Sequence, residues 1–428
     1  MWQAASRWTA LVAAGASLLV FSRVFGDDGA AQLLGEEGIA VAIGKALQGI
    51  GTLCATAAGA WIGAHRRTRT RACKRSAAPT TSAAPASSAA SASRVGSADD
   101  RSRRDRLVAI GALVVLTAFG AELLAAYSDS TGRPAMLLFS VAFFAMLYGC
   151  PALLIREIAR RTGRGWPAIL LLSAAAGLLQ AGVIDQSLFS DSYGDVRGWE
   201  ESLRATYIAP LGVGGYMLQN FVLGHVLYSF CAPIALAEAM RPGIAHRSWL
   251  GRRGIIIATG LWLLVAALIL SDTLGSESHA TVPEVLATLA AIAALVAAAL
   301  RVGRGERAAS ARTPRVRTTL AVSFLVASVH SAAPETWAGF AVALLAAATG
   351  GWLLMRAARS RDWGIEHIAA VGTGALLSRG ALAFLYYPVV GETSAGQKYA
   401  HNVVMLLIVT AAGAYAIRRA RSPRSIGP

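Results

Sequence analysis

Long apolar runs separated by short arginine clusters constrain this chain more than any single motif. Each run approaches the roughly 20 residues that an α-helix needs to cross the hydrocarbon core of a bilayer. Only 15% of the 428 residues are charged, whereas a soluble domain has about 25%. The pattern predicts an all-α fold, a polytopic bundle of membrane helices, and excludes an ordinary soluble protein.

About twelve transmembrane helices are predicted from these runs. The ninth run is the weakest of them, because it is short and contains His330. The predicted spans are Trp8–Phe25, Ile39–Ala64, Leu107–Tyr127, Ala135–Ile155, Pro167–Phe189, Leu211–Met240, Gly254–Ser271, Val285–Leu300, Thr318–Ala333, Trp337–Met355, Ile365–Tyr387 and Tyr399–Ile417.

Arginine clusters follow every second predicted helix, and the intervening loops are neutral or acidic. Basic loops are retained on the cytoplasmic side of membranes, so the alternation predicts that both termini are cytoplasmic. The same distribution accounts for the net charge of +16 without a nucleic-acid partner. The predicted parts are a two-helix membrane hairpin (1–64), a basic, low-complexity, disordered cytoplasmic linker (65–106), a ten-helix membrane core (107–418) and a cytoplasmic tail (419–428).

Short similarities between the two halves leave two interpretations open, a parallel 6+6 repeat and chance similarity. The letters AGLLQAGV in the fifth predicted helix correspond to GALLSRGA in the eleventh, and LLIREIARRTGRGW corresponds to LLMRAARSRDW. Helices six apart share an orientation, so the repeat axis would run along the membrane normal. Chance similarity between alanine- and leucine-rich helices is the alternative.

Polar side chains interrupt several predicted spans in what would be the outer half of the membrane. An arginine near the bilayer centre costs about 3 kcal/mol on insertion scales unless it finds a carboxylate, water or headgroups. Pro233 removes a backbone donor from the sixth predicted helix and is expected to act as a hinge. The candidates for one shared polar pocket are Arg379, Glu122, Asp185, Lys45, Gln48, Gln180, Asn220, His225 and His330.

Each of these candidates also has a purely structural interpretation. Asp185 would lie at the water boundary, and Lys45 would extend its amine towards the headgroups. His225 would hydrogen-bond a neighbouring helix. Arg379 would form an ion pair with Glu122 or Asp185 that only holds helices together. We favour the functional pocket for Arg379.

Two resemblances follow from local motifs. The letters RRTGRGWPAILLLSAAAGLLQAGVIDQSLF, LGHVLYSFCAPIALAEAMRP and WLGRRG resemble a group of multi-pass proteins of high-GC bacteria, which implies a bacterial plasma membrane. Phe221 and His225 also resemble the FxxxH motif of CAAX-protease-like intramembrane proteins. Gln180 and Ala181 stand where that family has paired glutamates, and they cannot supply its catalytic carboxylate.

These observations together favour a secondary-transporter-like membrane protein. The expected partners are membrane lipids and a small polar or anionic solute; neither a cofactor nor a metal site is predicted. A non-transporting membrane scaffold or sensor is the main alternative, and a degenerate intramembrane hydrolase is the third.

Overall fold

The computed structural model describes residues 88–422, apart from 128–129, 194–195, 277, 304–312 and 391–392, and side chains from residue 102 onward. The first two predicted spans, together with Lys45 and Gln48, lie outside the described residues. The chain divides into two compact units, Met1–Ala92 and Ser93–Pro428. Apart from the first residues of its first described helix, the fold below belongs to the second unit.

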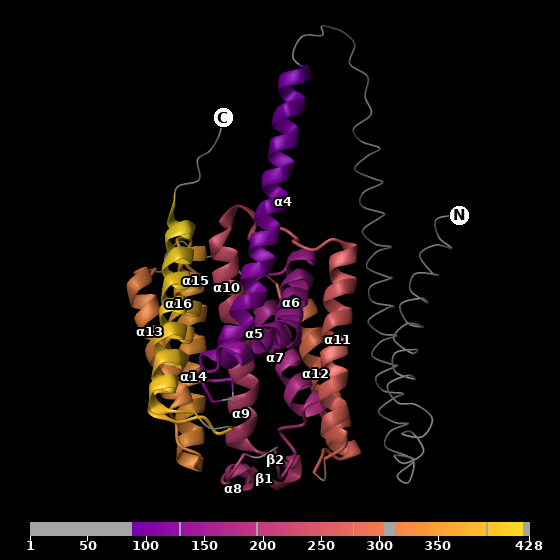
Figure 1. Cartoon of the computed structure of the whole chain (residues 1–428), viewed down its shortest axis with the longest axis vertical. Helices are drawn as coiled ribbons and strands as arrows, with labels where there is room; N and C mark the ends of the chain where they lie inside the picture. The colour runs from indigo at the N-terminus through magenta and orange to yellow at the C-terminus, as the bar shows by residue number, and fades with distance from the viewer. Residues whose placement is uncertain are drawn as a thin grey trace, which may run out of the picture. The chain divides into compact units, whose positions relative to one another are not determined.

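Helices make up almost all of the described chain (Figure 1). The α-helices are α4 (Ser88–Ala118), α5 (Pro134–Phe144), α6 (Cys150–Arg161), α7 (Trp166–Leu179), α8 (Trp199–Arg204), α9 (Gly215–Gly224), α10 (Ala232–Met240), α11 (Arg252–Leu274), α12 (Val282–Arg301), α13 (Val316–Ser331), α14 (Trp337–Ala358), α15 (Ile365–Leu382) and α16 (Ala395–Arg421). The π-helical segments are η2 (Phe119–Leu123), η3 (Ala145–Gly149), η4 (Gln180–Ile184) and η6 (His225–Cys231). The remaining elements are the 3₁₀ turns η5 (Ala209–Leu211), η7 (Pro242–Ile244) and η8 (Ala383–Leu385) and the short antiparallel strands β1 (Tyr207–Ile208) and β2 (Val213–Gly214).

Nine helical segments of the described residues are long and apolar enough to cross a membrane. A further apolar helix, α13, is shorter. The prediction of an all-α, multi-pass membrane protein is therefore confirmed. The count of twelve spans, the side on which the termini lie and the 6+6 repeat stay predictions.

Several boundaries differ from those predicted. Helix α4 begins at Ser88, so the last part of the predicted disordered linker (65–106) is helical, in keeping with the high helix propensity of its alanines. The fifth predicted span ends at Ile184 rather than at Phe189. The sixth begins at Gly215 rather than at Leu211, because Gly212 takes a positive φ of 67° between the paired strands β1 and β2.

The helices pack as one bundle in which some are central and others peripheral (Figure 1). Helix α15 packs against α10, α13 and α16, and α7 packs against α12. Helices α11, α12 and α14 keep most of their apolar surface outside the protein interior. In a membrane this surface would contact acyl chains.

Small residues bring two pairs of helices into backbone contact. A Cβ atom on Gly120 of η2 would lie 2.1 Å from the carbonyl oxygen of Tyr228 in η6. A Cβ atom on Gly374 of α15 would lie 2.5 Å from the carbonyl oxygen of Leu320 in α13. These glycines set how closely the polar side chains of neighbouring helices approach one another.

Candidate functional site

Four of the membrane-crossing segments in the described chain contain a π-helical segment, namely η2, η3, η4 and η6. A π-helical turn adds a residue to the helix and is often found at functional sites. Segment η6 packs against η2 and η3, and α15 also packs against η6. Segments η2, η3 and η6 thus surround one region of the bundle together with α15, and the predicted polar residues Glu122, His225 and Arg379 lie there.

Glu122 is the buried acid of this region, with 7% of its surface exposed. It lies in η2, and its carboxylate accepts a hydrogen bond from the hydroxyl of Tyr127. The Tyr148 hydroxyl, from η3, donates to the other carboxylate oxygen at 3.1 Å. Two phenol donors therefore satisfy this carboxylate, and no cation of the described residues is in direct contact with it.

Arg379 lies in the last turn of α15, opposite η2 and η6. Its Nη2 donates to the carbonyl oxygen of Ala121 at 2.7 Å, and its guanidinium carbon lies 4.7 Å from the ring centroid of Tyr228. Its Nε is buried without a hydrogen-bond partner among the described residues. The predicted direct ion pair is absent from the described chain: Arg379 interacts electrostatically with Glu122, but no carboxylate there lies within 4.0 Å.

His225 and Tyr228 complete this group from η6. The His225 ring is half-buried, 5.4 Å from the Tyr148 ring, and its Nδ1 lies 3.1 Å from the Ser229 hydroxyl. The hydroxyl of Tyr228 lies 2.7 Å from that of Ser331 in α13. We call Glu122, Tyr148, His225, Tyr228 and Arg379 the π-helix cluster.

Asp185 follows η4 at the end of its span, beside the π-helix cluster. Its carboxylate accepts from the Gln180 side-chain amide at 3.1 Å and from the Ser187 backbone N–H at 3.0 Å. Burial raises the pKa of the Asp185 carboxyl, and these hydrogen bonds oppose the increase. Asp185 also interacts electrostatically with Glu122. Asp185 and Gln180 thus lie near Glu122, and their membership of one functional pocket stays a prediction.

An aromatic pair from the segment between η4 and α9 lies at the same end. Tyr193 stacks on Trp199 with ring centroids 4.6 Å apart, and Trp199 lies 5.8 Å from Phe221. Tyr193 interacts electrostatically with both Asp185 and Glu122. Burial raises the pKa of the Tyr193 hydroxyl, while 39% of its surface is exposed. This loop therefore borders the acidic side of the π-helix cluster.

Two predicted site residues lie elsewhere. Asn220 is exposed on α9. His330 is buried, and its Nδ1 lies 3.3 Å from the carbonyl oxygen of Ala343 in the neighbouring helix α14. Pro233 occupies the first turn of α10, directly after η6. Since proline lacks an N–H and its ring collides with the preceding turn, it favours the π-helical geometry before it.

The geometry lends no support to intramembrane hydrolysis. His225 hydrogen-bonds a serine hydroxyl, whereas a water-activating histidine would need a carboxylate or metal. Among the described residues there is no group of three or more His, Cys, Asp or Glu side chains that could hold a metal ion.

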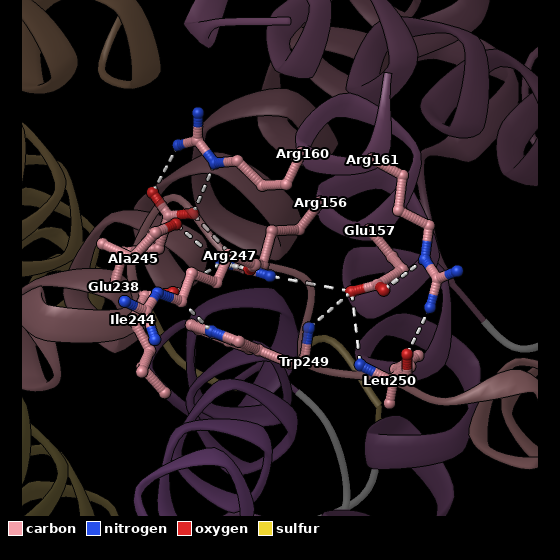
Figure 2. A network of polar contacts seen from close by, with 10 residues as sticks. All are labelled: Arg156, Glu157, Arg160, Arg161, Glu238, Ile244, Ala245, Arg247, Trp249 and Leu250. Atoms are coloured by element: carbon pink, nitrogen blue, oxygen red, sulfur yellow. Dashed lines mark hydrogen bonds and ion pairs between the residues drawn. The ribbon is translucent and has the colours of Figure 1, made fainter. Parts of the chain in front are cut away.

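A second polar network lies at the arginine-rich end of the bundle (Figure 2). Arg156 of α6 has no exposed surface. Its Nε donates to Glu238 of α10 at 3.0 Å, and its guanidinium carbon lies 3.4 Å from the Trp249 ring centroid. Its Nη2 donates to the carbonyl oxygens of Ala245 at 2.6 Å and Arg247 at 2.8 Å. One arginine thereby binds α6 to both α10 and the following loop.

Carboxylates close this network on both sides of Arg156. Glu238 also accepts from Nη2 of Arg160 at 2.6 Å. Glu157 accepts from Nε of Arg161 and from the Trp249 backbone N–H at 2.9 Å. Because the charges are paired inside the protein, we interpret this Arg156 network as structural.

The sequence analysis missed the tyrosines that hold Glu122. Tyr127 and Tyr148 were counted only as parts of apolar helices, although a buried tyrosine hydroxyl needs a partner. That requirement, together with a single buried glutamate at similar depth, was the available signal.

No protein-family model, curated protein or solved structure matches this chain. The class rests on the fold itself: the apolar helices define a multi-pass membrane protein. Within this class, the π-helix cluster is the region that provides a basis for a specific function.

Proposed function

We propose that the protein is a secondary-transporter-like membrane protein that binds a small anionic solute at the π-helix cluster. One observation carries the proposal: the Arg379 guanidinium lies in a mostly apolar setting with no carboxylate of the described residues in direct contact, while Glu122 is satisfied by tyrosines. A guanidinium with an unused N–H is suited to a carboxylate or phosphate oxygen.

The surroundings of Arg379 favour binding of an anion over a fixed ion pair. Electrostatic attraction strengthens as the local dielectric constant falls. The face of Tyr228 and the carbonyl of Ala121 hold the guanidinium in place, and the His225 ring lies in the same cluster, against the Tyr148 ring. A bound anion would add the counter-charge, and Glu122 would compete with it for Arg379.

The π-helical segments supply the mobility that transport requires. Single π-helical turns inside α-helices occur frequently at functional sites, and in this proposal η2 and η6 are the segments that rearrange when the solute moves. Pro233 favours such a change at the base of η6. In this proposal the arginine-rich end of the bundle faces the cytoplasm of a bacterial cell.

Thermal unfolding of the purified full-length protein tests the binding site. We expect at least one anion from a panel of small mono- and dicarboxylates and inorganic phosphate to raise the Tm. Arg379→Gln should abolish the increase, and Arg379→Lys should keep part of it because the charge remains. The matched control is Arg356→Gln, which removes an exposed arginine of α14 and should leave the increase intact.

Uptake of the same anion into proteoliposomes then tests transport. A Tm increase without uptake would favour the sensor alternative. An anion response that persists in Arg379→Gln would show that the π-helix cluster is not the binding site.

A further inference from the structure

A cleft at the arginine-rich end of the bundle is separate from both polar sites described above. It has a volume of about 560 Å³ and lies where α13 and α15 begin and α16 ends. Its lining residues are Thr313, Pro314, Arg315, Val316, Arg317, Asp362, His367 and Arg421. Segments far apart in the sequence therefore contribute arginines to one concave surface.

Hydrogen bonds hold the floor of the cleft in place. The Thr313 and Ser360 hydroxyls are hydrogen-bonded to each other. Nε2 of His367 lies 3.2 Å from the carbonyl oxygen of Pro314, and Nδ1 accepts from the Gly364 backbone N–H at 3.2 Å. The chain before α13 is thus fixed to the start of α15, so the cleft is a formed part of the fold.

The charge of the cleft is positive and unpaired. The side chains of Arg315, Arg317 and Arg421 are exposed, and within the described residues they make neither a hydrogen bond nor an ion pair. Asp362 is the one acid in the lining. A net positive cleft with unused guanidinium donors selects an anionic oxygen ligand.

The N-terminus of α13 adds a second feature that favours an anion. Its N-cap residue, Arg315, makes no side-chain hydrogen bond to the first turn. The free N–H groups and the helix dipole at such an end attract negative charge, above all phosphate. Val316 and Arg317, the first residues of the helix, line the cleft.

The surface next to the cleft favours a lipid as the source of a phosphate that would bind there. Leu325 on α13 and Leu407 on α16 are each 62% exposed. These helices flank α15 and extend from the cleft into the membrane-spanning part of the bundle. A headgroup in the cleft would leave acyl chains free to lie along these apolar faces.

We propose that this cleft binds the phosphate of an anionic phospholipid headgroup. Basic pockets between transmembrane helices bind such headgroups in other membrane proteins. The proposal is independent of solute binding at the π-helix cluster, because the two sites share no residue.

Native mass spectrometry of the detergent-purified full-length protein tests the proposal, with phosphatidylglycerol, phosphatidylcholine and inorganic phosphate as probes. We expect phosphatidylglycerol to bind at least about tenfold more tightly than phosphatidylcholine. The variant Arg315→Gln/Arg317→Gln/Arg421→Gln should lose this preference. The matched control, Arg252→Gln/Arg253→Gln/Arg301→Gln, removes exposed arginines from α11 and α12 and should keep it.

Inorganic phosphate distinguishes the two sources of the ligand. If it does not displace phosphatidylglycerol at millimolar concentration, the lipid is the ligand. If phosphate binds alone and the lipid preference is absent, the lipid assignment is overturned. Equal loss of lipid binding in both triple variants would also overturn the proposal, since it would show that the lipid responds to surface arginines in general and not to those of the cleft. Thermal unfolding of both variants confirms that they are folded.

Discussion

Hydrogen bonds from two tyrosine hydroxyl groups offset the desolvation free energy of burying the Glu122 carboxylate. Removing the Tyr148 hydroxyl leaves the carboxylate with one phenol donor in the same buried position. We expect Tyr148→Phe to lower the free energy of unfolding by about 1–3 kcal/mol. Chemical unfolding measures this change. Tyr415→Phe is the matched control, because its hydroxyl accepts from Arg241 at the exposed surface and should matter little.

A double variant separates the hydrogen bond from general damage. Glutamine at position 122 is neutral and needs less compensation than a carboxylate. The cost of Tyr148→Phe should therefore shrink in a Glu122→Gln background. An unchanged cost would show that the hydroxyl acts through something other than Glu122.

Arg156 is the residue whose loss should destabilise the bundle most. Arg156→Ala would leave Glu238 with Arg160 alone and would remove the contact with the Trp249 ring. Breaking a buried charge network in this way costs about 3–5 kcal/mol. The exposed residue Arg252 provides the comparison: Arg252→Ala should change the unfolding free energy by less than about 0.5 kcal/mol. Equal effects would refute the structural importance of the network.

A charged residue inside an apolar run has to find a polar partner, and on this ground the sequence analysis grouped Arg379 with Glu122. The two side chains interact electrostatically in the structure, while their role in a functional pocket stays a prediction. The partner itself could not be predicted, because it depends on side-chain geometry across helices. Arg379 contacts a carbonyl oxygen and an aromatic ring instead of a carboxylate.

At the scale of elements, the contact between η2 and η6 depends on Gly120. A methyl group at this position would collide with the carbonyl oxygen of Tyr228 and force the backbones apart. We expect Gly120→Ala to cost about 1–3 kcal/mol in stability and to weaken any anion response. Gly111→Ala on the same span meets no atom within 4 Å and should be neutral or stabilising by up to about 1 kcal/mol. Thermal unfolding of the two variants side by side measures the difference.

Helix positions were predictable where hydrophobicity alone decides them. The ten predicted spans from Leu107 onward correspond to ten apolar helices of the structure, although their ends shift by several residues. The π-helical segments were not predictable, because one inserted residue leaves the apolar pattern almost unchanged. Pro233 gave the available hint, because its missing N–H predicts an irregularity in the helix, and it lies directly after η6.

For the whole molecule, the orientation in the membrane is the prediction with the widest consequence. A single cysteine at Ser276, in the loop between α11 and α12, should react with a membrane-impermeant maleimide in intact cells. A single cysteine at Arg361, between α14 and α15, should react only after lysis. Both variants are made after the four native cysteines have been replaced. The opposite labelling pattern would invert the topology.

The Arg156 network restricts the direction in which the bundle can open. Parting α6 from α10 at that end would separate Arg156 and Arg160 from Glu238 and would leave ions stranded in a dry interior. The opposite ends of the same helix pair run into π-helical turns, where no comparable clasp joins the described residues. The two helices are therefore held together at the Arg156 end and can separate only at the opposite end. If the protein moves a solute as proposed, a route that reaches the end of the bundle with the Arg156 network would have to run between other helices.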